Sequence, residues 1–195
     1  MNSIFVGNSS VLAIETGITQ AYAQLGQRAL GFFVVHVAGK SYGIRSPEAT
    51  LLACSFDAVR RRIARRGKHV VQFGSEPDAA KVVDAVRAVM FEDDRQSESF
   101  FGKSAAELRE YLAVNEIVWA PDGDAAFDDG GHVLQIDQGA RVRVIAFRNA
   151  DSREAVANSL ADVWLNADEF YDLLSEWQSR FESEWRAVLK NATSR

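Results

Sequence analysis

The C-terminal part of the chain carries an apolar stripe that constrains the fold more than any other sequence feature. From Asn166 to about Lys190, large apolar side chains recur every three or four residues, which predicts one long amphipathic helix. Each buried aromatic side chain of this stripe is expected to contribute roughly 1.5–3 kcal/mol of transfer free energy, so the helix should hold the core together. The stripe consists of Phe170, Leu173, Leu174, Trp177, Phe181, Trp185 and Val188.

Two groups of β-rich segments are predicted on either side of a helical middle region. In the N-terminal group, Val11–Glu15 and the alternating segment Gly31–Ala38 are strand candidates. Gly39-Lys40 then predicts a tight turn into Ser41–Ile44, which is the signature of a hairpin.

A meander of strands is predicted in the second half of the chain. Its strands lie around Ile117, at His132–Asp137 and at Arg141–Phe147, with a turn in the region Asp137–Ala140. Ala161–Leu165 is a further strand candidate.

The middle region has helical periodicity. One helix is predicted from about Ser55 to Arg66 and a second from Pro77 to Phe91, whose apolar stripe runs through to its end. Ser104 and Glu107 have the spacing of a capping box that opens a third helix.

These elements predict a single α+β domain over residues 1–195. We expect an antiparallel sheet, made by the N-terminal hairpin and the C-terminal meander, packed by helices that include the long aromatic-rich C-terminal helix.

Composition excludes several classes of function. The net charge of −5 disfavours nucleic acid or an anionic membrane as the main ligand, because both require a cationic surface. Cys54 is the only cysteine, so no internal disulfide forms, as in a reducing compartment. The N-terminus lacks the pattern of a signal peptide, and no segment approaches the roughly 20 apolar residues that span a bilayer. We therefore expect a cytoplasmic protein.

An acidic loop, Asp122–Asp129, concentrates Asp122, Asp124, Asp128 and Asp129 around Phe127. Its first residues resemble a calcium loop, but position 126 is alanine and no glutamate closes the motif, so we predict no metal site. Two interpretations remain: a wide turn that uses its aspartates for local backbone hydrogen bonds, and a loop that recognises a basic partner.

The segment Glu92–Lys103 breaks the helical pattern and is predicted to be an acidic loop with an apolar tip. Phe100 and Phe101 form that tip, and aromatic side chains dominate binding energy at protein interfaces. We expect Phe100, Phe101 and Phe127 to be apolar anchors for a partner, and the four aspartates to be electrostatic anchors.

No catalytic or cofactor-binding constellation is recognisable. The basic run in 60–68 is interpreted as a solvated helix face. Alternatively, it pairs with the acidic loop of the same chain or with a second copy, and the second case would give a homodimer. His36, His69 and His132 lack metal-ligand spacing, and Cys54 lies in an apolar run typical of an inert buried thiol. We therefore predict no enzyme activity, no metal and no cofactor.

Several segments together resemble immunity protein family 42 of bacterial polymorphic-toxin systems. In the first half these are Ile4–Gly7, Val11–Glu15, Gly31–Gly39 and Tyr42–Ile44. In the second half they are Trp119–Asp124, Phe127–Gly130, Val142–Phe147 and the stretch Trp164–Trp185 with Glu169–Tyr171 and Trp177.

The resemblance implies a non-catalytic protein that protects the producing cell by binding a cognate secreted toxin. The acidity of the chain suits a basic toxin such as a nuclease. The alternative from a different class is a small regulatory domain that binds a cation or another ligand through the Asp122–Asp129 loop. Motifs shared across a family tend to serve its fold, which favours Glu92–Lys103 as the segment that sets toxin specificity.

Overall fold

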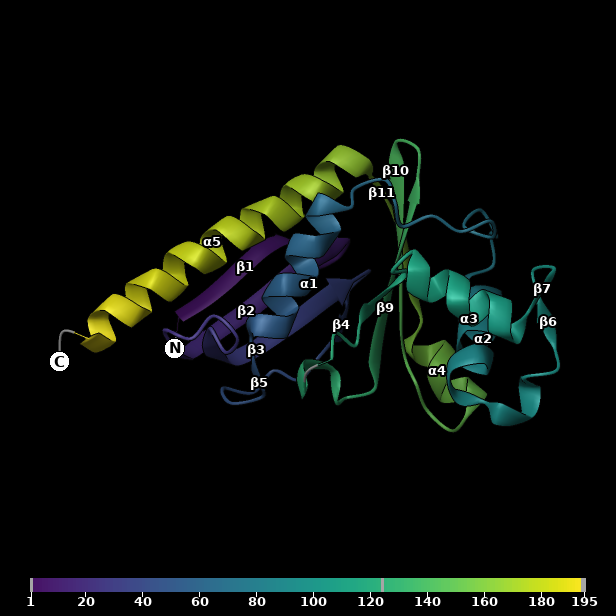
Figure 1. Ribbon diagram of the computed structural model, residues 1–195, viewed down its shortest axis with the longest axis horizontal. Helices are drawn as coiled ribbons and strands as arrows, with labels where there is room; N and C mark the ends of the chain where they lie inside the picture. The colour runs from purple at the N-terminus through teal and green to yellow at the C-terminus, as the bar shows by residue number, and fades with distance from the viewer. Residues whose placement is uncertain (1, 124, 194–195) are drawn as a thin grey trace.

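The computed structural model describes residues 2–123 and 125–193, and it confirms the α+β class (Figure 1). The N-terminal hairpin and the C-terminal meander belong to two separate antiparallel sheets, where the sequence predicted one. A third, very small sheet is a two-stranded hairpin.

The N-terminal sheet has the strand order β1-β2-β3-β4, with β5 paired to β3. Its strands are β1 (Asn2–Asn8), β2 (Leu12–Ala21), β3 (Ala29–Val37), β4 (Lys40–Tyr42) and β5 (Thr50–Leu51). The sequence did not predict β1 as a strand. It forms because Ile4 and Val6 alternate toward the core, where they are 6% and 4% exposed, while Phe5 points outward.

The predicted hairpin between β3 and β4 is present, with its turn one residue earlier than expected. Ala38 and Gly39 occupy the turn with φ values of 48° and 81°. Positive φ at both central residues is typical of the type I′ turn, whose twist matches that of the strands it joins.

The C-terminal sheet has the order β11-β10-β9-β8 and confirms the predicted meander. Its strands are β8 (Val118–Ala120), β9 (Gly131–Gln138), β10 (Arg141–Arg148) and β11 (Ala161–Asn166). The small hairpin is made of β6 (Ser99–Phe100) and β7 (Lys103–Ser104).

Helices cover both sheets. They are α1 (Ala53–Ala64), α2 (Ala79–Phe91), α3 (Ala105–Val114), α4 (Arg153–Ser159) and α5 (Ala167–Thr193), with 3₁₀ turns η1 (Asp93–Arg95) and η2 (Ala125–Phe127).

The helix ends show how local chemistry defines these elements. The capping box of Ser104 and Glu107 is confirmed at the start of α3. By contrast, Pro77 does not open α2 as expected. Asp78 caps that helix by accepting a hydrogen bond from the backbone N–H of Ala80 at 2.9 Å, and Pro77 precedes the cap.

Two apolar cores are separated by the C-terminal sheet. The first core lies between the N-terminal sheet, α1, α5 and one face of the C-terminal sheet. The second core lies between the opposite face and α2, α3 and α4. Successive β9 residues therefore enter different cores: Val133 faces the first and Leu134 the second.

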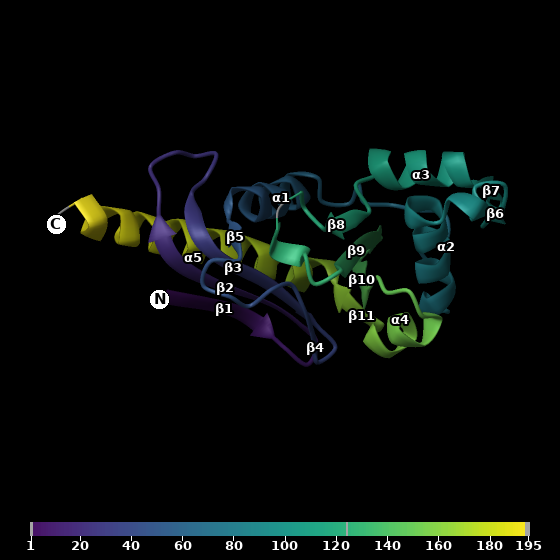
Figure 2. The same cartoon turned by 90° about the horizontal axis from the view of Figure 1, so that it is seen from below.

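The two apolar cores lie at opposite ends of an elongated molecule (Figures 1 and 2). The helix α5 runs along the N-terminal sheet toward the end where both chain termini lie, and α2, α3, α4 and the β6–β7 hairpin gather at the opposite end (Figures 1 and 2). The Glu92–Lys103 segment therefore lies at the end of the molecule that is far from the termini.

Candidate partner-binding surface

The aspartates of the Asp122–Asp129 loop occupy different environments. Asp128 is exposed, and its side chain makes no hydrogen bond or ion pair with the rest of the described chain. Asp122 is half-buried and lines a pocket of about 200 Å³ together with Arg61, Arg62 and Trp119. Asp124 lies outside the described residues.

Asp129 is part of the framework that joins the two sheets. Its Oδ2 atom accepts hydrogen bonds from the backbone N–H of Gly43 and from Nε of Arg148, both at 3.1 Å. Its Oδ1 atom accepts one from the backbone N–H of Gly131 at 3.0 Å. This carboxylate links the end of β4 to the start of β9 and the end of β10, so it is already satisfied within the chain.

We expect the neighbouring aspartates to respond oppositely to truncation. Asp129→Ala should lower the free energy of unfolding by about 1–3 kcal/mol, because two backbone N–H groups and Arg148 lose their acceptor. Asp128→Ala, the matched control, should change it by less than about 0.5 kcal/mol. Denaturant unfolding of both variants measures this, and equal stability of the two would contradict the structural role of Asp129.

Phe127 belongs to the first core and is not an anchor that a partner can reach. It is 3% exposed and packs edge-on against Phe33, with ring centroids 6.1 Å apart. The burial of Phe127 fixes η2 against the first core, so this side chain offers no surface to a partner.

The Glu92–Lys103 segment is held firmly against α2. The Arg95 guanidinium contacts the carboxylates of Asp84, Glu92 and Glu98 at 2.9–3.1 Å. These bonds lower the pKa of the Asp84 carboxyl group, chiefly through the Arg95 hydrogen bond. The Gln96 amide also donates to the backbone carbonyls of Ala88 and Glu92. The segment therefore presents a preformed surface.

The predicted aromatic tip of this segment is partly internal. Phe100 is 9% exposed and packs in the second core, while Phe101 is half-buried and stacks on Phe73 with ring centroids 4.4 Å apart. Phe101 and Gly102 form the β6–β7 turn with φ values of 53° and 76°.

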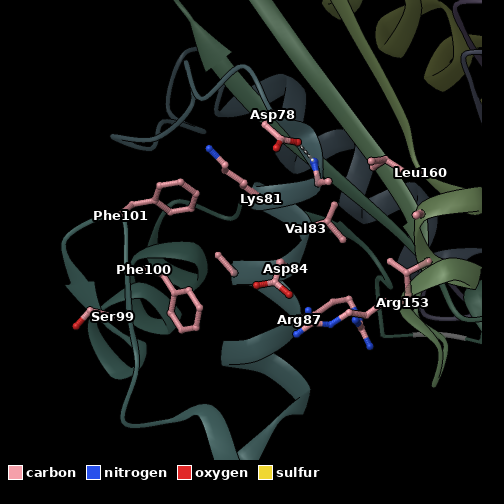
Figure 3. Close-up of a pocket in the computed structure, with 14 residues that line it drawn as sticks. Asp78, Lys81, Val83, Asp84, Arg87, Ser99, Phe100, Phe101, Arg153 and Leu160 are labelled. Atoms are coloured by element: carbon pink, nitrogen blue, oxygen red, sulfur yellow. Dashed lines mark hydrogen bonds between the residues drawn. The ribbon is translucent and has the colours of Figure 1, made fainter.

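Both aromatic residues line a groove on the outer side of α2. The groove has a volume of about 540 Å³ and lies between α2, the β6–β7 hairpin and α4 (Figure 3). Figure 3 shows Phe100 and Phe101 on one side of α2 and Arg153 and Leu160 on the other. Such a volume is in the range of ligand and side-chain binding sites.

The C-terminal end of α2 exposes apolar side chains that the helical pattern predicts to be buried. Met90 is 36% exposed and Phe91 is 44% exposed. The Phe91 ring contacts the His132 ring edge-on at a centroid distance of 5.2 Å, and His132 stacks on Phe147 at 5.0 Å. Because His132 lies three residues after Asp129, the last residue of the acidic loop, this contact brings the end of α2 toward the end of that loop.

Three exposed carboxylates lie near Phe91 or His132 in the sequence. Asp93 and Asp94 follow Phe91 in the chain, and Asp128 precedes His132. All three are exposed, and within the described residues their side chains have no cationic partner. We define the α2-end surface as Met90, Phe91, Asp93, Asp94 and Asp128. The sequence did not predict that Met90 and Phe91 are exposed, because the exposure of side chains at the end of a helix depends on how far the sheet beneath the helix extends.

The basic run on α1 is mostly engaged within the protein. Arg62 is 4% exposed and donates to the backbone carbonyls of Glu116 and Val118 and to Oε1 of Gln135, so a wholly solvated face is wrong for this residue. Burial lowers the pKa of Arg62 to about 9. Arg65 pairs with Glu116, and Arg66 pairs with Asp168.

Arg62 belongs to a buried polar network. Gln135 connects it to Asp137, whose carboxylate also accepts hydrogen bonds from Tyr171 Oη at 2.9 Å and from the backbone N–H of His69 at 3.2 Å. Burial, and then the charge of Arg62, lower the pKa of His69. The network fastens α1, α5 and the loop before α2 to β9, and we interpret it as structural.

The histidines do not converge. His36 contacts Glu15 at 3.1 Å, His69 lies in the buried network and His132 packs between aromatic rings. Across residues 2–123 and 125–193, no group of three or more histidine, cysteine or acidic side chains is placed to hold a metal ion. Among the described helices, none has the length and apolarity needed to cross a membrane.

The family model described as Immunity protein 42 matches residues 3–180. A solved structure, the crystal structure of CdiI from Burkholderia dolosa AUO158, is similar with a TM-score of 0.57 and 13% sequence identity. The similarity covers 91% of this chain and 99% of that chain, and at this identity it shows a shared fold. No curated protein matches.

Proposed function

We propose that this chain, which belongs to immunity protein family 42, neutralises a cognate bacterial toxin by binding it stoichiometrically, without chemical reaction. The family match over residues 3–180 supports the role of a toxin-neutralising immunity protein.

One observation carries the proposed binding site: an exposed aromatic side chain next to carboxylates that have no partner in the described chain. Phe91 is 44% exposed at the C-terminal end of α2. Exposed apolar side chains grouped on a rigid element mark interaction sites, and aromatic residues supply much of the binding energy. We therefore assign the α2-end surface as the toxin-binding site.

The charges of this surface suggest the chemistry of the toxin. Asp93, Asp94 and Asp128 would attract lysine and arginine side chains and speed the encounter with a basic protein. A nuclease fits this description, because its substrate-binding face is cationic. An immunity protein that covers this face would block access of the nucleic acid substrate to the active site.

The alternative function, a cation-binding regulatory domain, has no observation in its favour. Asp129 is already bonded to Gly43, Gly131 and Arg148, and the described part of the acidic loop brings no metal-binding cluster together.

The test is the association rate with the toxin domain encoded by the neighbouring gene. The triple variant Asp93→Asn, Asp94→Asn, Asp128→Asn should associate about tenfold or more slowly at low salt, with a flatter dependence on ionic strength. Stopped-flow fluorescence measures both quantities.

A charge-matched control distinguishes local attraction from net charge. The variant Glu48→Gln, Glu169→Gln, Asp172→Asn also removes three exposed carboxylates, from a loop beside the N-terminal sheet and from α5. It should associate at nearly the rate of the unmodified protein. Equal slowing of both variants, or no slowing of the first, would exclude the α2-end surface as the electrostatic site.

A further inference from the structure

One face of α2 has a groove near the start of the helix and an exposed aromatic side chain, Phe91, at its end. Ala80, Asp84 and Phe91 recur at helical spacing, so they share one face of the helix. The groove opens beside Ala80 and Asp84, and Phe91 projects from the other end. With a rise of 1.5 Å per residue, Phe91 lies roughly 10 Å along the axis from Asp84.

The charges at the two ends have opposite sign. At the groove, Arg153 makes no ion pair within the described residues, and Lys81 has only a 3.9 Å contact with Glu76. Two acidic residues also line the groove: Asp84 pairs with Arg95 at 3.0 Å, and Asp78 caps α2 by accepting a hydrogen bond from the backbone N–H of Ala80. At the other end, Asp93 and Asp94 follow the exposed Phe91 and lack cationic partners in the described chain.

The shape of the groove also suits an aromatic side chain. Its volume of about 540 Å³ is lined largely by apolar side chains, with cations at its edge. A phenylalanine flanked by carboxylates is the complementary ligand, and this chain presents such a group on the same helix. The larger apolar side chains of this lining are Val83, Phe100, Phe101, Val156 and Leu160.

We propose that this groove binds Phe91 of a second copy of the chain, and that the α2 helices of the two copies pack antiparallel in a symmetric dimer. A twofold axis near the middle of α2 makes each contact twice, since each copy donates one Phe91 and offers one groove. Asp93 and Asp94 of each copy then face Lys81 and Arg153 of the other, so charge and shape are satisfied together.

The dimer has a consequence for toxin binding. Phe91, Asp93 and Asp94 also belong to the α2-end surface, so a copy held in the dimer cannot use them to bind toxin. This consequence rests on the proposed function, whereas dimerisation itself does not and is tested without any toxin.

Sedimentation equilibrium of the full chain, over a wide range of protein concentration at low salt, tests the proposal. The unmodified protein should reach twice the mass of one chain. Phe91→Ser should raise the dissociation constant by at least about tenfold, because it removes the central anchor. Phe5→Ser is the matched control, since Phe5 is 43% exposed on β1 against 44% for Phe91.

A charge exchange tests the pairing itself. Lys81→Glu with Arg153→Glu should weaken the dimer, as should Asp93→Lys with Asp94→Lys, and all four changes together should restore it. Unfolding curves show that each variant is folded. A monomeric unmodified protein at all concentrations, or a fourfold variant no tighter than either pair, would overturn the proposed dimer.

Discussion

Phe91→Ala is expected to weaken binding of the cognate toxin by about 2 kcal/mol, close to a 30-fold rise in the dissociation constant. The Phe91 ring is anchored against His132 at 5.2 Å and yet is 44% exposed, so it is both rigid and accessible. A rigid aromatic group loses little conformational entropy on binding, which is why such residues dominate interface energies. Most of the loss should be in the dissociation rate, measured by surface plasmon resonance.

Phe5→Ala is the control for this prediction, because Phe5 has nearly the same exposure, 43%, and also contacts a histidine ring, that of His36, at a centroid distance of 5.6 Å. It lies on β1, far from α2, and should leave toxin affinity unchanged. Equal affinity of the Phe91→Ala variant and the unmodified protein would remove the α2-end surface from the proposal.

The toxin measurement is also separable from dimerisation. Lys81 and Arg153 belong to the groove and not to the α2-end surface. A variant with Lys81→Glu and Arg153→Glu should therefore lose the dimer and keep toxin binding. Loss of both in that variant would show that the toxin uses the groove.

Trp177→Ala is expected to lower the free energy of unfolding by about 3–5 kcal/mol, the largest effect of any single change that we predict. Trp177 lies on α5, and its side chain is completely buried in the first core with residues of the N-terminal sheet and α1. Its ring contacts Phe33 edge-on at 5.2 Å and stacks on Phe181 at 5.3 Å. Its indole N–H donates to Oγ1 of Thr16 at 2.9 Å, so truncation leaves both a cavity and an unpaired hydroxyl group.

The expected loss is measured by denaturant unfolding, with Ser179→Ala on the exposed face of the same helix as control. The control should change stability by less than about 0.5 kcal/mol. A cost below about 1 kcal/mol for Trp177→Ala would mean that α5 does not hold the first core together.

Local patterns predicted much of this fold. Three patterns were recognisable in the sequence: the apolar stripe of α5, the capping box of α3 and the alternation in β9 and β10. Each of them depends only on residues that are a few positions apart in the chain. The helix α4 was missed, since seven residues are too few for a periodic pattern. The separation into two sheets was also missed, because strand alternation does not say which strands pair.

The candidate site was predictable only in part, and neighbouring residues show why. Asp128 and Asp129 are chemically identical, but Asp129 accepts a hydrogen bond from Gly43, 86 residues earlier in the chain. Phe127 and Phe91 are both aromatic, but one packs against Phe33 in the core and the other is left exposed at the end of α2.

The amino-acid sequence by itself determined the α+β class, the main helices and strands, the acidic character and the family resemblance, because these follow from composition and short-range periodicity. Only the tertiary structure decided which carboxylates and aromatic rings stay available to a partner. That availability depends on contacts between residues far apart in the chain: these contacts engage Asp129 and bury Phe127, and they leave Phe91, Asp93, Asp94 and Asp128 at the surface.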